Sequence, residues 1–107
     1  MKSNIGLLVR IEARPEHADE VEQLLRAALD AARAEEQTVT WFAFRESPTV
    51  FGIFDTFTDE AGRTGHLNGP IAAALMDIAP TVMESAPALL ATAPDIRPVD
   101  ILAVKPI

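Results

Sequence analysis

The sequence predicts an α+β protein of the ferredoxin-like class, in which an antiparallel sheet with the order βαββαβ carries its helices on one face. Two observations carry this prediction. Apolar residues alternate with a period of two in four stretches and recur every three or four residues in the stretches between them. The second and third strands are joined by only three residues, which makes them a hairpin. With 107 residues, the chain is expected to form a single domain, residues 1–107.

The first strand is expected at Ile5–Ala13, where apolar residues occupy every second position. Pro15 suits the first position of a helix whose first turn is acidic. This helix is expected to reach Ala32, and its apolar stripe should lie on the sheet.

The second and third strands are expected at Thr38–Glu46 and Val50–Phe57, joined by the turn Ser47-Pro48-Thr49. Both faces of the third strand are largely apolar, so we expect other parts of the structure to pack on both of its faces.

A broken helix is expected after the third strand. Thr58 or Asp59 can cap its first turn. Pro70 lacks the backbone N–H of a helix interior and therefore begins a second helix. His66 is thus expected at a helix break, near backbone groups without helical partners.

The remainder of the chain carries weaker signals. One helical turn is expected at Pro80–Ser85, and Ala86–Ile96 is expected to be irregular, with Ala88–Ala91 ambiguous between strand and helix. The last strand is expected at Val99–Val104.

Composition excludes several classes of function. A net charge of -7 argues against nucleic acid or an anionic membrane as partner. The absence of cysteine excludes disulfides, thiolate nucleophiles and cysteine-bound metals, and it fits a reducing, cytoplasmic location. Neither a signal-peptide core nor an apolar stretch long enough to span a bilayer occurs in the sequence.

Apolar residues on both faces of the strands predict a homodimer. The helices cover one face of the sheet, and the other would be an exposed patch larger than monomers usually carry. Burial of that face against a second copy of the chain resolves this.

The stretch from the third strand to Pro70 resembles a known family. The run Phe57-Thr58-Asp59-Glu60-Ala61, followed by His66-Leu67 and Gly69-Pro70, is similar to the motif of the antibiotic biosynthesis monooxygenase (ABM) domains of the dimeric α+β barrel superfamily. The resemblance covers nearly the whole chain and implies a dimeric barrel. Family members include cofactor-independent oxygenases that convert phenols to quinones, haem degraders, and proteins without assigned activity.

Haem is not the cofactor that this sequence suggests. Haem degraders of this fold use a histidine on the helix after the third strand, and here that part reads Ala72-Ala73-Ala74-Leu75-Met76. We therefore expect no cofactor and no metal. The resemblance favours a cofactor-independent monooxygenase acting on a small aromatic or quinol substrate.

The candidate site is a pocket between the third strand and the broken helix, with His66 at its mouth as a neutral catalytic base. Trp41 could stack on an aromatic ring, and Arg45 lies on the same face of its strand and could hold an anion. Asp55 and Phe57 complete the expected substrate-binding residues, with Asp55 on an otherwise apolar face.

Other interpretations of these residues remain open. His66 can be a structural cap or make a hydrogen bond across a dimer, Trp41 can belong to the core, and Arg45 can form a cross-strand ion pair with Asp55. The alternative to an enzyme is a non-catalytic dimeric barrel that binds a small hydrophobic or quinone-like molecule. A regulatory module is disfavoured because the sequence offers no basic recognition helix.

Overall fold

The helices and strands follow one another in the predicted order. The computed structural model describes residues 5–78 and 88–105. Its elements are β1 (Ile5–Glu12), a short 3-10 helix (Pro15–His17), α1 (Ala18–Ala27), α2 (Leu29–Arg33), β2 (Thr38–Arg45), β3 (Val50–Phe57), α3 (Glu60–Leu67), α4 (Pro70–Ile78) and β4 (Asp95–Asp100). Within these ranges no helix is long and apolar enough to cross a membrane.

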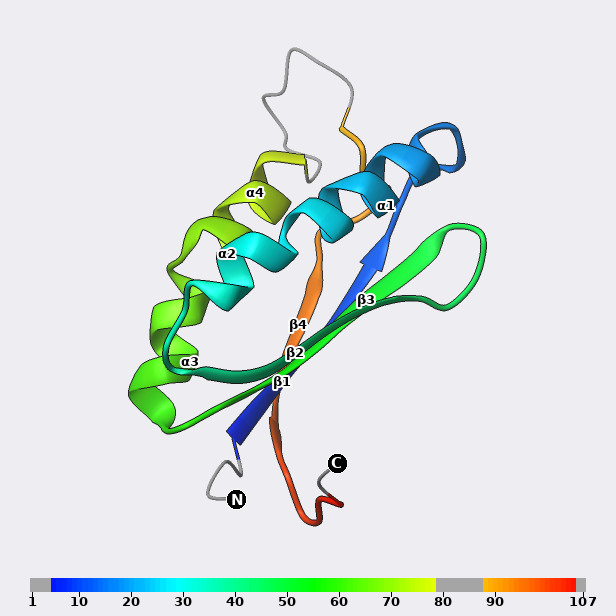
Figure 1. Cartoon of the computed structure of the whole chain (residues 1–107). Coiled ribbons are helices and arrows are strands. Elements are labelled where there is room, and N and C mark those ends of the chain that lie inside the picture. The colour runs from blue at the N-terminus through cyan, green and yellow to red at the C-terminus, as the bar shows by residue number, and fades with distance from the viewer. Residues whose placement is uncertain (1–4, 79–87, 106–107) are drawn as a thin grey trace.

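The four strands form one antiparallel sheet in the order β2-β3-β1-β4. The helices lie together on one face of this sheet (Figure 1). This confirms the α+β, ferredoxin-like fold. The hairpin register places Trp41 opposite Asp55 and Arg45 opposite Phe51, so the considered ion pair between Arg45 and Asp55 does not form.

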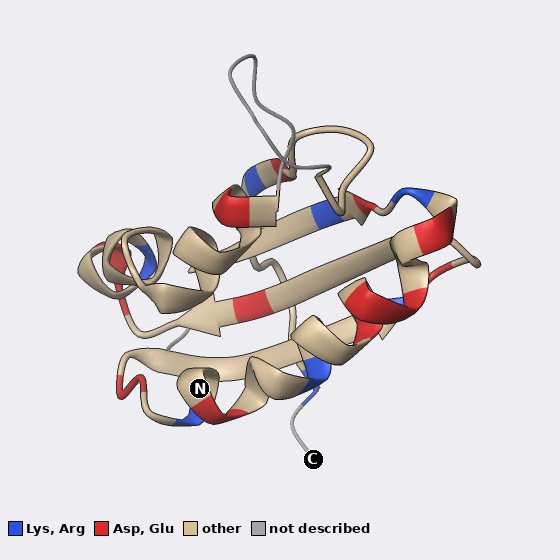
Figure 2. Ribbon diagram, turned by 90° about the horizontal axis from the view of Figure 1, so that it is seen from above, with Lys and Arg blue, Asp and Glu red and all other residues tan. Residues whose placement is uncertain are grey.

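The hydrophobic core lies between the sheet and the helices. Leu7, Ile11 and Ile53 of the central strands are almost fully buried. Val21 of α1 and Ile71 of α4 pack against the same cluster. Charged positions lie mostly on the helices and turns, although β3 carries an acidic residue along its length (Figure 2).

The break between α3 and α4 occurs where the sequence places it. The carboxylate of Asp59 accepts a hydrogen bond of 2.9 Å from the Gly62 N–H, which caps α3. Pro70 is the first residue of α4. His66 lies in the last turn of α3, immediately before the break.

The prediction for the last strand is wrong in its position. β4 runs over Asp95–Asp100, where Ile96 pairs with Val9 and Pro98 with Leu7. A proline is tolerated here because β4 is an edge strand with one free side. The expected helical turn at Pro80–Ser85 lies outside the described residues, and Ala88–Leu90 is irregular except for a bridge between Ala13 and Leu90.

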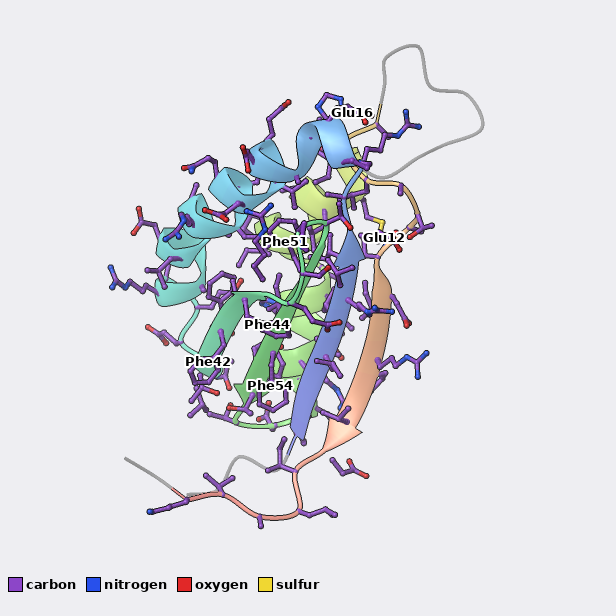
Figure 3. The ribbon with its side chains drawn as sticks, turned by 90° about the vertical axis from the view of Figure 1, so that its right-hand side faces the viewer. Glu12, Glu16, Phe42, Phe44, Phe51 and Phe54 are labelled. Carbon is purple, nitrogen blue, oxygen red and sulfur yellow. The ribbon has the colours of Figure 1, made fainter. Side chains whose placement is uncertain are left out.

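The face of the sheet opposite the helices carries exposed apolar side chains. Phe42 is 57% exposed, and Leu8 and Phe44 are also exposed. Figure 3 shows Phe42, Phe44 and Phe54 on this face. The Phe44 ring covers Gly52, where a Cβ atom would overlap it. In the described part of the chain, this face has no covering layer.

Candidate functional site

A pocket of about 410 Å³ lies along β2 and opens between this strand and α1. This volume falls in the range of small-molecule sites. The lining is mainly aromatic and aliphatic, with three charged groups: Glu22, Leu25, Arg26, Leu29, Trp41, Phe42, Ala43, Phe44, Arg45 and Phe51. Trp41 and Arg45, both expected from the sequence to bind substrate, therefore do line a pocket, although it is not the one expected.

Arg45 is held in place by several partners. Its Nη1 lies 2.8 Å from a carboxylate oxygen of Glu22, its Nη2 donates to the Pro48 carbonyl at 2.6 Å, and its guanidinium lies 4.9 Å from the centre of the Phe51 ring. Hydrogen bonds from Arg45, and then from Arg26, lower the pKa of Glu22. The guanidinium is thus largely neutralised by its own surroundings and shapes the pocket wall.

The second part of the site is a buried charged cluster made by Asp55 of β3, His66 of α3 and Glu35, which lies between α2 and β2. His66 Nδ1 lies 2.6 Å from Glu35 Oε1, and His66 Nε2 lies 2.9 Å from Asp55 Oδ2. The Phe57 ring, 5.2 Å from the imidazole between centroids, supports it from one side. Asp55 and His66 are 0% and 8% exposed.

The surroundings of His66 favour its protonated form. Burial alone would lower its pKa, but the contacts with Asp55 and then with Glu35 outweigh burial and raise the pKa above 6.5. The last turn of a helix also favours a positive charge. The sequence predicted His66 as a neutral base, whereas these contacts favour its protonated form.

The opening expected between β3 and the broken helix is only a hollow of about 20 Å³ beside His66. Ile71 and Leu75 of α4 are buried against the sheet and close it. The glycines of α3 and Pro70 break the helix, but α4 remains packed against the sheet. The space for a ligand consequently lies on the other side of Trp41, along β2.

Trp41 connects the pocket to the charged cluster. It lines the pocket, and it is the residue directly opposite Asp55 in the β2–β3 register. Side chains at such paired positions have Cβ atoms about 5 Å apart. Trp41 also packs against the hydrophobic core, so the core interpretation and the pocket interpretation both apply.

The structure leaves three buried polar atoms at this junction without a hydrogen-bond partner among the described residues: Trp41 Nε1, Asp55 Oδ1 and Asp55 Oδ2. Asp55 Oδ2 nevertheless lies 2.9 Å from His66 Nε2, within ion-pair distance. An unsatisfied buried group costs about 1–3 kcal/mol, so such groups are rare and often functional. A donor on Trp41 and an acceptor on Asp55, at opposite positions of neighbouring strands, are the two groups that a hydroxyl group can satisfy.

Sequence reasoning missed Glu35 and the pocket residues of α1. No periodic pattern marks Glu35, because it belongs to a connection and reaches His66 only through the tertiary fold. In the described ranges, no group of three or more His, Asp or Glu side chains is arranged to hold a metal ion.

Several solved structures share the fold of this chain, and one of them is similar enough in sequence to show a common family. No protein-family model and no curated protein sequence matches the chain. The solved structure of a proposed antibiotic biosynthesis monooxygenase from Caulobacter crescentus is 18% identical, with a TM-score of 0.68 over 95% of this chain and 92% of that one. At this identity the likeness shows a shared fold.

Two other solved structures are more similar in sequence. The PA3566 protein from Pseudomonas aeruginosa is 25% identical, with a TM-score of 0.74 over 96% of this chain and 98% of that one. The NE2512 protein of unknown function from Nitrosomonas europaea is 43% identical, with a TM-score of 0.87 over 99% of this chain and 96% of that one. The chain therefore belongs to the same family as the Nitrosomonas europaea protein.

Proposed function

We propose that the protein is a cofactor-independent monooxygenase that oxidises a small phenol or quinol. The observation that carries this proposal is that Trp41, which lines an aromatic pocket, and the buried Asp55 opposite it in the register both carry polar atoms without a hydrogen-bond partner. The fold shared with proteins named antibiotic biosynthesis monooxygenases supports the same class of reaction.

The substrate ring would occupy the pocket against Trp41 and Phe51, with its hydroxyl directed toward Asp55. Asp55 Oδ1 accepts the hydroxyl proton, and the Trp41 N–H donates to the oxygen that becomes negative. The resulting anion is electron-rich enough to reduce dioxygen. One oxygen atom enters the ring and the other leaves as water, so that phenol and dioxygen yield quinone and water.

His66 acts with Asp55 in this proposal. In its protonated form, which the raised pKa favours, His66 holds the Asp55 carboxylate from one side, while Glu35 holds the imidazolium from the other. The proton acceptor is therefore the carboxylate of the pair, and His66 positions it. Phe57 restrains the imidazole ring.

The active form is proposed to be a homodimer in which two sheets pack together through their open faces, that is, the faces opposite the helices. Phe42 and Phe44 lie on this face, as does Leu8, which is opposite Phe54 in the register, and all three are exposed in a single chain. Such a patch is typical of a surface that is buried in an assembly.

The second candidate function is a non-catalytic dimeric barrel that binds a small hydrophobic molecule. One observation favours it: both ring nitrogens of His66 contact carboxylates and Arg45 is paired with Glu22, so neither is free to act on a ligand. In that case Trp41 and Asp55 would hydrogen-bond a ligand without changing it.

Oxygen uptake separates these two functions. Purified protein is incubated with a panel of quinols and anthrones in the presence of a metal chelator, and binding is followed in parallel by fluorescence of Trp41, the sole tryptophan. An oxygenase consumes one dioxygen for each quinone formed. Saturable quenching of Trp41 without oxygen uptake for any bound compound identifies the binding module.

A further inference from the structure

The hollow of about 20 Å³ beside His66 lies between the central strands and α4. Every other residue that lines it is aliphatic, among them Val9 of β1, Ile53 of β3 and Ile71 of α4. Sites for drug-sized ligands begin at about 300 Å³. The hollow is therefore far too small for an aromatic ring, and only a molecule of a few atoms fits in it.

This hollow excludes water on chemical grounds. A buried water needs two to four polar partners, and His66 is the sole polar side chain in the lining. Both of its ring nitrogens already contact carboxylates, Nδ1 that of Glu35 and Nε2 that of Asp55. Small cavities lined by aliphatic side chains stay dry and take up apolar molecules instead.

A second apolar hollow, of about 30 Å³, lies between α1 and α4 (Figure 1). Ile71 and Leu75 line both hollows, so these two buried side chains form the wall between them. The second hollow also includes Leu24 and Ala74, which are half-buried. It therefore lies nearer to the surface of the helical layer than the hollow beside His66.

The second hollow also borders the aromatic pocket. Leu25 of α1 is buried and lines both of these spaces. The side chains of a protein core are closely packed but still change rotamer. A molecule of two atoms can then pass where an aromatic ring cannot. The two hollows and the pocket thus form an apolar series that is separated only by aliphatic side chains.

We propose that the two hollows hold dioxygen and supply it to the pocket from the helical side, while the phenol or quinol occupies the opening between β2 and α1. Dioxygen is apolar and diatomic and needs no hydrogen bond, which matches spaces that exclude water. The use of this dioxygen rests on the proposed oxygenase function. Its binding in the hollows does not, because that depends only on their size and lining.

Methyl relaxation measures the binding without any substrate. Dioxygen is paramagnetic and increases the relaxation rate of the methyl groups that it contacts, so methyl-labelled protein is compared under dioxygen and under argon. Ile71 lines both hollows, whereas Ile11 is a buried isoleucine of the same core that lines neither. We expect the increase at Ile71 to exceed that at Ile11 several-fold. Equal increases at the two residues overturn the binding of dioxygen in the hollows.

Filling the hollow beside His66 tests the supply of dioxygen. Ala72 of α4 lines this hollow, and its neighbour Ala73 is exposed and does not. Ala72→Val should raise the KM for dioxygen several-fold and leave the KM for the quinol unchanged, because the added carbons occupy only the hollow. Ala73→Val makes the same change in helix propensity and should alter neither constant. Circular dichroism verifies that both variants are folded.

The outcomes distinguish this inference from the proposed function. Equal KM values for dioxygen in the two variants overturn the supply, even where dioxygen contacts Ile71. A protein that consumes no dioxygen with any quinol overturns the oxygenase, and the supply falls with it. Relaxation at Ile71 still decides in that case whether the hollows bind dioxygen.

Discussion

Asp55 shows how much of the site can be predicted from single residues and how much depends on tertiary contacts. A carboxylate on the apolar face of β3 was recognisable from alternation alone, and so was Trp41 on the neighbouring strand. The raised pKa of His66 was not, since it depends on contacts with Asp55 and with Glu35, which lies 31 residues earlier in the chain. The sequence therefore indicated the residues but not the protonation state that decides their roles.

His66 should make stability depend on pH. Its pKa is raised above 6.5 in the folded protein. Below that value the imidazole is protonated in both folded and unfolded chains and its contribution is complete. As the pH rises through the folded pKa, the contribution is lost. We expect the free energy of unfolding of the wild type, minus that of His66→Gln, to decrease over this window in urea titrations. A difference that increases with pH would contradict the assignment.

At the scale of elements, the sequence alone predicts a helix boundary correctly where a single residue fixes the backbone conformation. Asp59 at the cap of α3 and Pro70 at the start of α4 placed the broken helix correctly. β4 was misplaced because Pro87 and Pro94 predicted an irregular segment at Ala86–Ile96, whereas the pairing of Ile96 with Val9 determines the strand. Strand pairing with β1 is a tertiary interaction that alternation in a short segment does not reveal.

The cap of α3 provides a matched test. Asp59→Ala removes the hydrogen bond to the Gly62 N–H, and we expect the free energy of unfolding to fall by about 1 kcal/mol. Asp59→Asn should retain most of the stability because asparagine is an equally good cap. Thermal or urea denaturation of the two variants decides this. Equal losses in both would mean that the charge of Asp59, rather than its cap, stabilises α3.

At the scale of the molecule, the sheet has one face that the helices cover and one that they leave open. The fold class and the apolar character of the open face follow from alternation, and the β2–β3 hairpin follows from its short connection. The location of the pocket does not, because it depends on how α1 and α2 lie beside the edge of β2. Side-chain packing between elements distant in sequence sets that geometry.

The open face should control assembly. Phe42 is 57% exposed in a single chain, so Phe42→Asp should have little effect on the fold of that chain. It should weaken the dimer by about 2 kcal/mol, roughly 30-fold in dissociation constant, as expected of an aromatic residue central to an interface. Sedimentation velocity over a concentration series measures this, with Met76→Asp as the control on α4. Identical monomer–dimer equilibria for both variants would exclude this face as the interface.

The most direct test of the central claim is turnover of Asp55→Asn on a phenol or quinol that the wild type oxidises, with chelator present and the dimer verified. The substitution keeps the shape of the side chain and removes the proton acceptor. We expect turnover to fall by about 100-fold or more, while Asp30→Asn, a change at an exposed aspartate of α2, leaves it unchanged. Turnover by Asp55→Asn equal to that of the wild type would contradict the role assigned to Asp55.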